Sequence, residues 1–228
     1  MRTTAPLVAA IGVLLSCGAM AQAQPPSAAN PTDVYLVSFF KAAPGQDAAL
    51  LKTVQQQDPK DPMAGHVLVL RHAQGSDWDF ATIQHVGATA TVRVRPQPDA
   101  GAKPPQPTQA WHTDTYVAGP AWDVFAKQMG VTGSDGGVYV VGVHRPVPGH
   151  RRELLDSLNQ ADPSAKVTTG RVTLEHIDGA INILTLERFN SWQDFAADMT
   201  ANPTGNKGWS DVRQHSAFHE DTLAERVR

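Results

Sequence analysis

Polar side chains recur at alternate positions of several expected strands, where they share one face of a sheet. A histidine and carboxylates gathered on such a face could transfer protons, because burial and neighbouring charges shift their pKa values. We predict three catalytic residues on this basis: His144, Glu175 and Glu187. Five further residues are predicted to bind the ligand: Arg171, Thr185, Thr82, Gln84 and His112. The alternative is that this polar face meets solvent or forms an interface, as one face of an antiparallel sheet often does.

Apolar residues occupy the positions between these polar ones, and we expect them to pack against helices. In the second half of the chain they are Val172, Leu174, Leu184 and Leu186. His72 and His176 follow the same apolar alternation, so a packing or hydrogen-bonding role is predicted for both, with a pair of equivalent ligands as the alternative.

The pattern aromatic-His-x-Asp-Thr occurs twice, at residues 111–115 and 218–222. On a strand it puts an imidazole and a carboxylate on one face, which could orient a general base or hold a metal. The two copies are expected at non-equivalent places in the fold, so coincidence is the alternative. Asp211, His215 and His219 stand four residues apart and would share one face of a helix. Surface histidines without such a role are commoner, and we predict no metal site.

Composition excludes several classes of protein. The 228 residues carry 19 Lys and Arg against 22 Asp and Glu, a net charge of −3, which argues against a nucleic-acid partner. A single cysteine excludes a disulfide framework and any multi-cysteine metal site. No phosphate-binding loop, dinucleotide-binding turn, serine elbow or His-Glu-x-x-His helix is present in the sequence. Nothing in the sequence identifies a cofactor.

The N-terminus predicts export. A positive start is followed by an apolar run at residues 5–16, which is too short to span a membrane, and by Ala21-Gln22-Ala23, which fits a signal-peptidase site. We predict a signal peptide over residues 1–23, a disordered lead-in over 24–32, and a periplasmic or secreted protein. Lipidation at Cys17, within a lipobox-like sequence, is the minor alternative.

The chain contains an internal repeat. Residues 34–37 (VYLV) align with residues 138–141 (VYVV) at an offset of 104 positions, and Pro44-Gly45 aligns with Pro148-Gly149 at the same offset. Each copy reads as strand, helix, β-hairpin and a Trp-x-x-Phe helix, beginning at Trp122 and Trp192. We predict two repeats, over residues 33–131 and 136–228.

Two differences separate the copies. The first contains a Pro-rich insertion over residues 87–119, interpreted as a lid, an arm or a neutral surface insertion, with a possible edge strand at 89–95. A ferredoxin-like unit also needs a fourth strand. In the second copy residues 213–227 could supply it or form a tail helix, whereas in the first copy it must be missing or come from elsewhere.

This order of elements resembles the dimeric α+β barrel superfamily, and in particular its antibiotic-biosynthesis monooxygenase-type domains. The resemblance implies an α+β fold in which two tandem ferredoxin-like repeats pack sheet to sheet, as a monomeric pseudo-dimer or a homodimer. It further implies that the polar strand faces line the space between the sheets.

The resulting functional hypothesis is an exported protein that binds a small aromatic or polar molecule. It could act as a cofactor-independent oxygenase or isomerase, and the sequence leaves open whether it is an enzyme. The alternative is a non-enzymatic module that binds haem or another ligand, or that interacts with a protein. A barrel filled by side chains would favour protein interaction.

Overall fold

The computed structural model describes residues 31–56, 63–92, 107–133, 136–160, 169–178, 183–201 and 207–227. The expected signal peptide, Cys17 and the lead-in up to residue 30 lie outside the described residues. The elements of the first half are β1 (Asp33–Ala42), α1 (Asp47–Gln55), β2 (Val67–Gln74), β3 (Phe80–Ala88), β4 (Gln109–Gly119) and α2 (Trp122–Gln128). Those of the second half are β5 (Val138–Pro146), α3 (Arg151–Asn159), β6 (Gly170–Asp178), β7 (Ile183–Phe189), α4 (Trp192–Ala201), α5 (Lys207–His215) and β8 (Ser216–Arg226).

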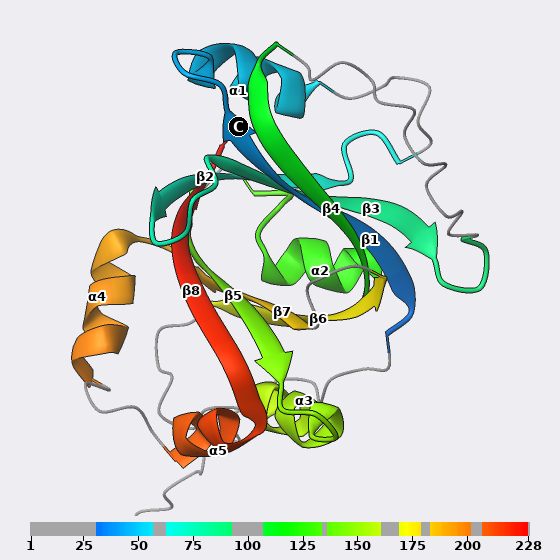
Figure 1. Cartoon of the computed structure of the whole chain (residues 1–228), viewed down its shortest axis with the longest axis vertical. Helices are drawn as coiled ribbons and strands as arrows, with labels where there is room; N and C mark the ends of the chain where they lie inside the picture. The colour runs from blue at the N-terminus through cyan, green and yellow to red at the C-terminus, as the bar shows by residue number, and fades with distance from the viewer. Residues whose placement is uncertain are drawn as a thin grey trace, which may run out of the picture.

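The strands form one closed antiparallel barrel in the order β1-β3-β2-β8-β5-β7-β6-β4. Within the first half the order is β4-β1-β3-β2, and the second half has the corresponding order β8-β5-β7-β6. The halves meet at two seams, where β2 pairs with β8 and β4 pairs with β6. Helices α1, α3, α4 and α5 lie outside the barrel and α2 lies within its outline (Figure 1). The expected α+β class with an antiparallel sheet is confirmed.

The fourth strand of the first half comes from the insertion. Residues 109–119 form β4, which pairs with β1 along its length and with β6 of the second half. The interpretation of this part as a lid, an arm or a surface insertion is therefore wrong, because its backbone completes the barrel. Residues 89–91 form a turn after β3 rather than an edge strand, and residues 93–106 lie outside the described residues. In the second half the fourth strand is β8.

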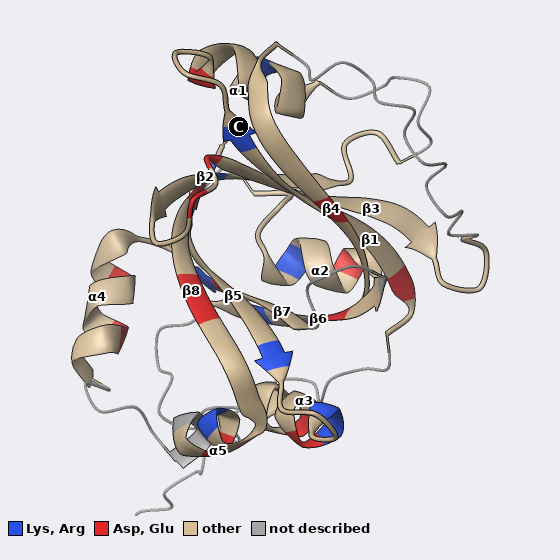
Figure 2. Cartoon of the chain, viewed as in Figure 1, with Lys and Arg blue, Asp and Glu red and all other residues tan. Residues whose placement is uncertain are grey.

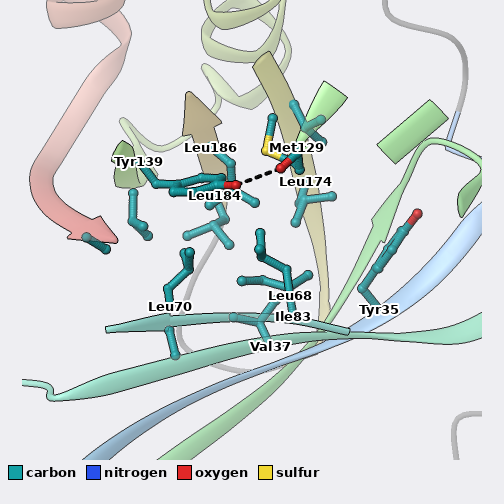
Figure 3. Packing of buried hydrophobic residues seen from close by; sticks show 14 of the residues in the cluster. Tyr35, Val37, Leu68, Leu70, Ile83, Met129, Tyr139, Leu174, Leu184 and Leu186 are labelled. Atoms are coloured by element: carbon teal, nitrogen blue, oxygen red, sulfur yellow. Dashed lines mark hydrogen bonds between the residues drawn. The ribbon is translucent and has the colours of Figure 1, made fainter. Parts of the chain in front are cut away.

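Apolar side chains from both halves fill the barrel. The cluster drawn in Figure 3 includes Tyr35, Val37, Leu68, Leu70, Ile83, Met129, Tyr139, Leu174, Leu184 and Leu186. An eight-stranded barrel has an interior about wide enough for side chains to fill.

The expected orientation of the β6 and β7 faces is therefore reversed. Val172, Leu174, Leu184 and Leu186 were expected to face helices, but they contact residues of the other half inside the barrel. Side chains alternate along a strand, so the polar residues between them face outward and do not line the space between the sheets. Barrel closure offers a larger apolar environment than the short helices do, which explains the reversal.

Helix α2 packs against the barrel core. Its Phe125 and the following Met129 are both fully buried in the interior cluster. Two tyrosines at equivalent positions of the halves hold its flanks: the Tyr35 hydroxyl donates to the Pro120 carbonyl and the Tyr139 hydroxyl to the Met129 carbonyl, each over 2.6 Å. Both tyrosines lie near the starts of β1 and β5, so α2 lies across that end of the barrel.

The aligned helix α4 lies elsewhere. Its first turn is capped by Ser191, whose hydroxyl oxygen accepts a hydrogen bond from the Asp194 N–H. Trp192 and Met199 are 39% and 49% exposed, whereas Met129, which aligns with Met199, is fully buried. The helices therefore share a sequence pattern but not a structural role. Among the described residues, no helix is long and apolar enough to cross a membrane.

The remaining helices cover parts of the outer face. Leu50 and Val54 of α1 pack on Val69 and Phe80 of the first half. In the second half, Ile183 of β7 packs in a cluster with α3 and α5, whose contributing residues are Leu154, Leu158 and Val212.

The different roles of α2 and α4 predict opposite effects of one substitution. Met129→Ala should lower the free energy of unfolding by about 2–5 kcal/mol, because it leaves a cavity in the barrel core. Met199→Ala, the aligned change on α4, should alter it by less than about 0.5 kcal/mol. Urea titration of both variants measures this, and equal losses would show that the two helices are equivalent after all.

Candidate functional site

The predicted polar residues of the second half lie on the outer face of the barrel. Thr185 of β7 stands opposite Thr173 of β6 on one side and opposite Gly142 of β5 on the other. Two residues further along β7, Glu187 stands opposite Arg171. Opposite residues of antiparallel strands project from the same face, so strand register brings this group together.

Helices cover this face on both sides of the polar group. Phe189, at the end of β7, packs edge-on against Phe195 of α4, with ring centroids 5.5 Å apart. At the other end of β7, Ile183 is buried under α3 and α5. Thr185 and Glu187 lie between these two contacts. Charged residues of both signs are visible on the neighbouring β5 and β8 (Figure 2).

Three polar side chains converge over the Cα of Gly142. In β8, Asp221 stands opposite Gly142 and His219 stands opposite His144. A Cβ at position 142 would lie 2.9 Å from His144 Nε2, 3.0 Å from Asp221 Oδ1 and closer still to Thr185 Oγ1. Only glycine leaves room for this arrangement, and the cluster of Gly142, His144, Thr185, His219 and Asp221 is called the Gly142 site below.

His144 is a buried, neutral imidazole. It is 2% exposed, its Nε2 lies 2.9 Å from Thr185 Oγ1, and its Nδ1 is buried without a hydrogen-bond partner among the described residues. The pKa of His144 is lowered from 6.5 to about 4. Burial is the larger cause and the nearby His219 the next, while Asp221 acts in the opposite direction. An unsatisfied buried nitrogen costs about 1–3 kcal/mol, so a ligand that bonds to it would recover that cost.

His219 and Asp221 form a carboxylate–imidazole pair beside His144. His219 Nε2 lies 2.8 Å from Asp221 Oδ1, and the His219 ring stacks on the His144 ring with centroids 4.7 Å apart. Both side chains are partly exposed, at 28% and 39%. An ionised carboxylate accepts a hydrogen bond from the Nε2–H group. This hydrogen bond fixes the orientation and the tautomer of the imidazole, as a general base requires.

The predicted carboxylates lie at the margin of this site. Glu187 pairs with Arg171 over 3.2 Å, and Glu175 pairs instead with Arg151 of α3 over 3.6 Å. Each of these side chains is at least 29% exposed, and such pairs contribute at most about 1 kcal/mol. The structure therefore joins Glu187 and Arg171 to one face with His144, and directs Glu175 toward a helix.

The predicted residues of the first half form a separate group. Thr82 and Gln84 lie on β3, opposite Ser38 and Leu36 of β1. His112 of β4 stacks on Phe40, with centroids 6.0 Å apart. Thr82, Gln84 and His112 thus belong to the outer face of the first half, and strand register does not bring them to the Gly142 site.

The aromatic-His-x-Asp-Thr pattern marks equivalent strands, contrary to expectation. Asp114 stands opposite Ser38 as Asp221 stands opposite Gly142. In the same register His112 stands opposite Phe40, and His219 stands opposite His144. The expectation of non-equivalent places is wrong because β4, rather than a strand after α2, is the fourth strand of the first half. This pattern is the sequence signal that pairs His219 with Asp221, whereas no signal in the sequence marks Gly142.

The other histidines have different roles. His72 packs edge-on against Trp78 in the barrel core, with centroids 5.3 Å apart, and His176 stands opposite the buried Val117. Helix α5 ends at His215 and His219 lies in β8, so the helical face expected to carry both does not form. Among the described residues, no group of three or more His, Cys, Asp or Glu could hold a metal ion.

Comparison with known proteins shows the fold. No family model matches the sequence, and no curated protein matches it. A crystal structure of an anthrone oxidase-like protein matches with a TM-score of 0.59 and 11% identity, over 88% of this chain and 94% of that chain. The chain therefore has the fold of the dimeric α+β barrel proteins.

Two weaker matches carry no argument of their own. A candidate chlorite dismutase matches with a TM-score of 0.47 and 10% identity, over 86% of this chain and 96% of that chain. A candidate monooxygenase from Lactobacillus acidophilus NCFM matches with a TM-score of 0.43 and 8% identity, over 86% and 94% of the two chains.

The lowered pKa of His144 predicts a loss of stability in acid. The unfolded chain binds this proton near pH 6.5 and the folded chain only near pH 4, so stability is full above pH 6.5 and falls between these values. The loss is on the order of 3 kcal/mol. In His144→Phe, urea titrations from pH 7 to pH 4 should show a correspondingly shallower decline. The exposed His112→Gln control should parallel the wild type, and a decline in His144→Phe as steep as in the wild type would contradict the assignment.

Proposed function

We propose that this protein is exported and binds a small hydroxylated aromatic molecule at the Gly142 site. The observation that carries this proposal is the buried His144 Nδ1, which has no hydrogen-bond partner among the described residues although its neighbours are paired. The N-terminal sequence supports export. The apolar filling of the barrel supports a site on the outer face rather than between the sheets.

The chemistry of the site favours this ligand class. A neutral imidazole and a threonine hydroxyl can each donate or accept a hydrogen bond, and Asp221 accepts one from a hydroxyl group. The His219 ring, already stacked on His144, offers a flat surface for an aromatic ring. A charged ligand would find no strong ionic partner in the neutral His144.

Proton transfer is the reaction that this site could support without a cofactor. The His219–Asp221 pair is suited to take a proton from a bound hydroxyl or an enolisable carbon and return it to another atom of the ligand. This is the chemistry of an isomerase, and it makes His219 the base and Asp221 the group that orients it. His144 and Thr185 would bind the ligand, and Arg171 with Glu187 would border the site.

We also propose that the barrel arose as a tandem duplication of one ferredoxin-like unit, so that a single chain forms the pseudo-dimer. Equivalent strand orders, the paired tyrosines at positions 35 and 139, and the equivalent register of β4 and β8 support this proposal. The Gly142 site would then be a specialisation of the second copy, because Ser38 and Phe40 stand at the positions of Gly142 and His144.

Protein interaction is a second candidate function. Trp111 and Phe218 occupy equivalent positions of β4 and β8, and they are 39% and 43% exposed. Exposed aromatic side chains are typical of interfaces, and the filled barrel is compatible with this function.

A panel of phenols and naphthols, tested by calorimetric titration, examines the proposed ligand class. At least one compound should bind the wild type, and Thr185→Val and His144→Phe should each weaken binding about tenfold or more, since each removes a hydrogen bond to the ligand. The matched control is Thr82→Val, the corresponding change in the first half, which should leave the dissociation constant unchanged.

Failure of the proposal would be plain in the same titrations. Binding that survives both substitutions, or that Thr82→Val weakens equally, would place the ligand elsewhere. Hemin is included as a separate probe: a Soret band that depends on a histidine, without binding of any phenol, would favour the haem-binding alternative.

A further inference from the structure

A pair of histidines lies outside the Gly142 site, where α3 and α5 lie side by side (Figure 1). His150 directly precedes α3, and His215 ends α5. Their Nδ1 atoms lie 3.1 Å apart, and their rings stack with centroids 5.3 Å apart at an interplanar angle of 25°. The two residues are 65 positions apart in the sequence, so no local spacing marks the pair.

Backbone hydrogen bonds connect both histidines through Val147. The Val147 N–H donates to the His215 carbonyl over 2.8 Å, and the His150 N–H donates to the Val147 carbonyl over 2.9 Å. The two helices also share a buried apolar cluster that includes Leu154 and Val212. The fold therefore holds the two imidazoles close together, in addition to the hydrogen bond between them.

The fold does not require these two imidazoles. In the first half, the Gln46 N–H donates to the Ala43 carbonyl over 2.9 Å, and the Ala43 N–H donates to the Thr108 carbonyl over 3.1 Å. These are the same backbone connections, so Gln46 and Thr108 stand at the positions of His150 and His215. The histidine pair is thus a feature of the second half that its backbone structure does not explain.

The bond between the two imidazoles is one that a metal ion can replace. A hydrogen bond between two Nδ1 atoms needs one protonated and one unprotonated nitrogen. Among the described residues, neither imidazole has another hydrogen-bond or ion-pair partner. If the donor ring exchanges its Nδ1 proton for one on Nε2 through water, both Nδ1 atoms present lone pairs and both rings stay neutral.

The separation of the two nitrogens suits ligands of one metal ion. Zinc–imidazole bonds are about 2.0–2.1 Å long, so two nitrogens on one tetrahedral ion lie about 3.3 Å apart. The 3.1 Å between the Nδ1 atoms of His150 and His215 is close to this value. His150 is exposed and His215 half-buried, so water can occupy the remaining coordination positions.

A second histidine pair provides a comparison within the chain. The Nδ1 atoms of His66 and His85 are also 3.1 Å apart. The His85 side chain is only 7% exposed, its Nε2 lies 2.8 Å from Asp33 Oδ2, and the Trp122 ring stacks on both imidazoles. Water has little access to complete the coordination of an ion there, so the distance alone does not make a site.

We propose that His150 and His215 bind one divalent transition-metal ion through their Nδ1 atoms. Imidazole suits zinc, copper and nickel, and affinity for a given site peaks at Cu²⁺, so Cu²⁺ binds more tightly than Zn²⁺. The ion ties the start of α3 to the junction of α5 and β8, which begins at Ser216. It stabilises the folded chain, because the unfolded chain does not hold the two histidines together.

The test is calorimetric titration of the full chain with Cu²⁺ and with Zn²⁺ at pH 7. His150→Gln and His215→Thr introduce the residues that the first half carries at these positions, so both variants should fold. Each should weaken binding of the ion at least tenfold, since even the loss of a group that supports a ligand typically costs about 10–100-fold. Electron paramagnetic resonance of the wild type with Cu²⁺ should show coupling to two imidazole nitrogens. Zn²⁺ should raise the melting temperature of the wild type more than that of either variant.

Two other histidine variants are the controls. His66→Gln alters the buried pair and His219→Gln alters the Gly142 site, and both should bind the ions as the wild type does. Wild-type affinity in His150→Gln or in His215→Thr would overturn the proposal, as would a wild type that binds neither ion. An equal loss in either control would place the ion at that control's site instead. Phenol binding should be unchanged in His150→Gln, so this proposal and the proposed function can fail separately.

Discussion

The pairing of β2 with β8 and of β4 with β6 closes eight strands into one sheet, and most other features depend on that closure. A closed sheet has no free edge, and the alternation of side chains gives it a single inside and a single outside. Leucines of both halves therefore meet inside. The charged and hydroxyl side chains between them must face outward, where short helices cover only part of the surface.

Closure also allows the two halves to carry different side chains in different places. Each half contributes four strands in the corresponding order. An outward-facing side chain does not take part in this pairing and need only fit its neighbours on the same face. On the outer face, Gly142 and His144 replace the first half's Ser38 and Phe40, and three polar groups can then converge. At the end covered by α2, the first half instead carries Asp33 and His85. The two halves thus share one strand order but differ in their polar side chains.

Much of the fold follows from local pattern, whereas the faces and the fourth strand do not. Residues 34–37 and 138–141 predicted the first strand of each half, and Trp192 predicted the start of α4. Leu174 and Leu184 do alternate with polar residues as expected, but they face the barrel interior instead of a helix. Alternation shows which residues share a face and does not show whether a helix or the opposite sheet packs on that face. Residues 109–119 follow a Pro-rich segment, and their strand partners β1 and β6 lie far away in the sequence, so local pattern does not identify them as a strand. His144, Thr185 and Glu187 were placed on one face, but convergence over Gly142 depends on register across three strands.

The most direct measurement of whether the halves complete one another is the mass of residues 136–228 alone by sedimentation equilibrium. Removing the first half leaves β6 and β8 as unpaired edges and uncovers the apolar face around Tyr139, Leu174 and Leu184. We expect a dimer, in which β6 of each copy pairs with β8 of the other. A monomer that unfolds cooperatively at high dilution would contradict it, because the half would then not need a partner to cover its interior.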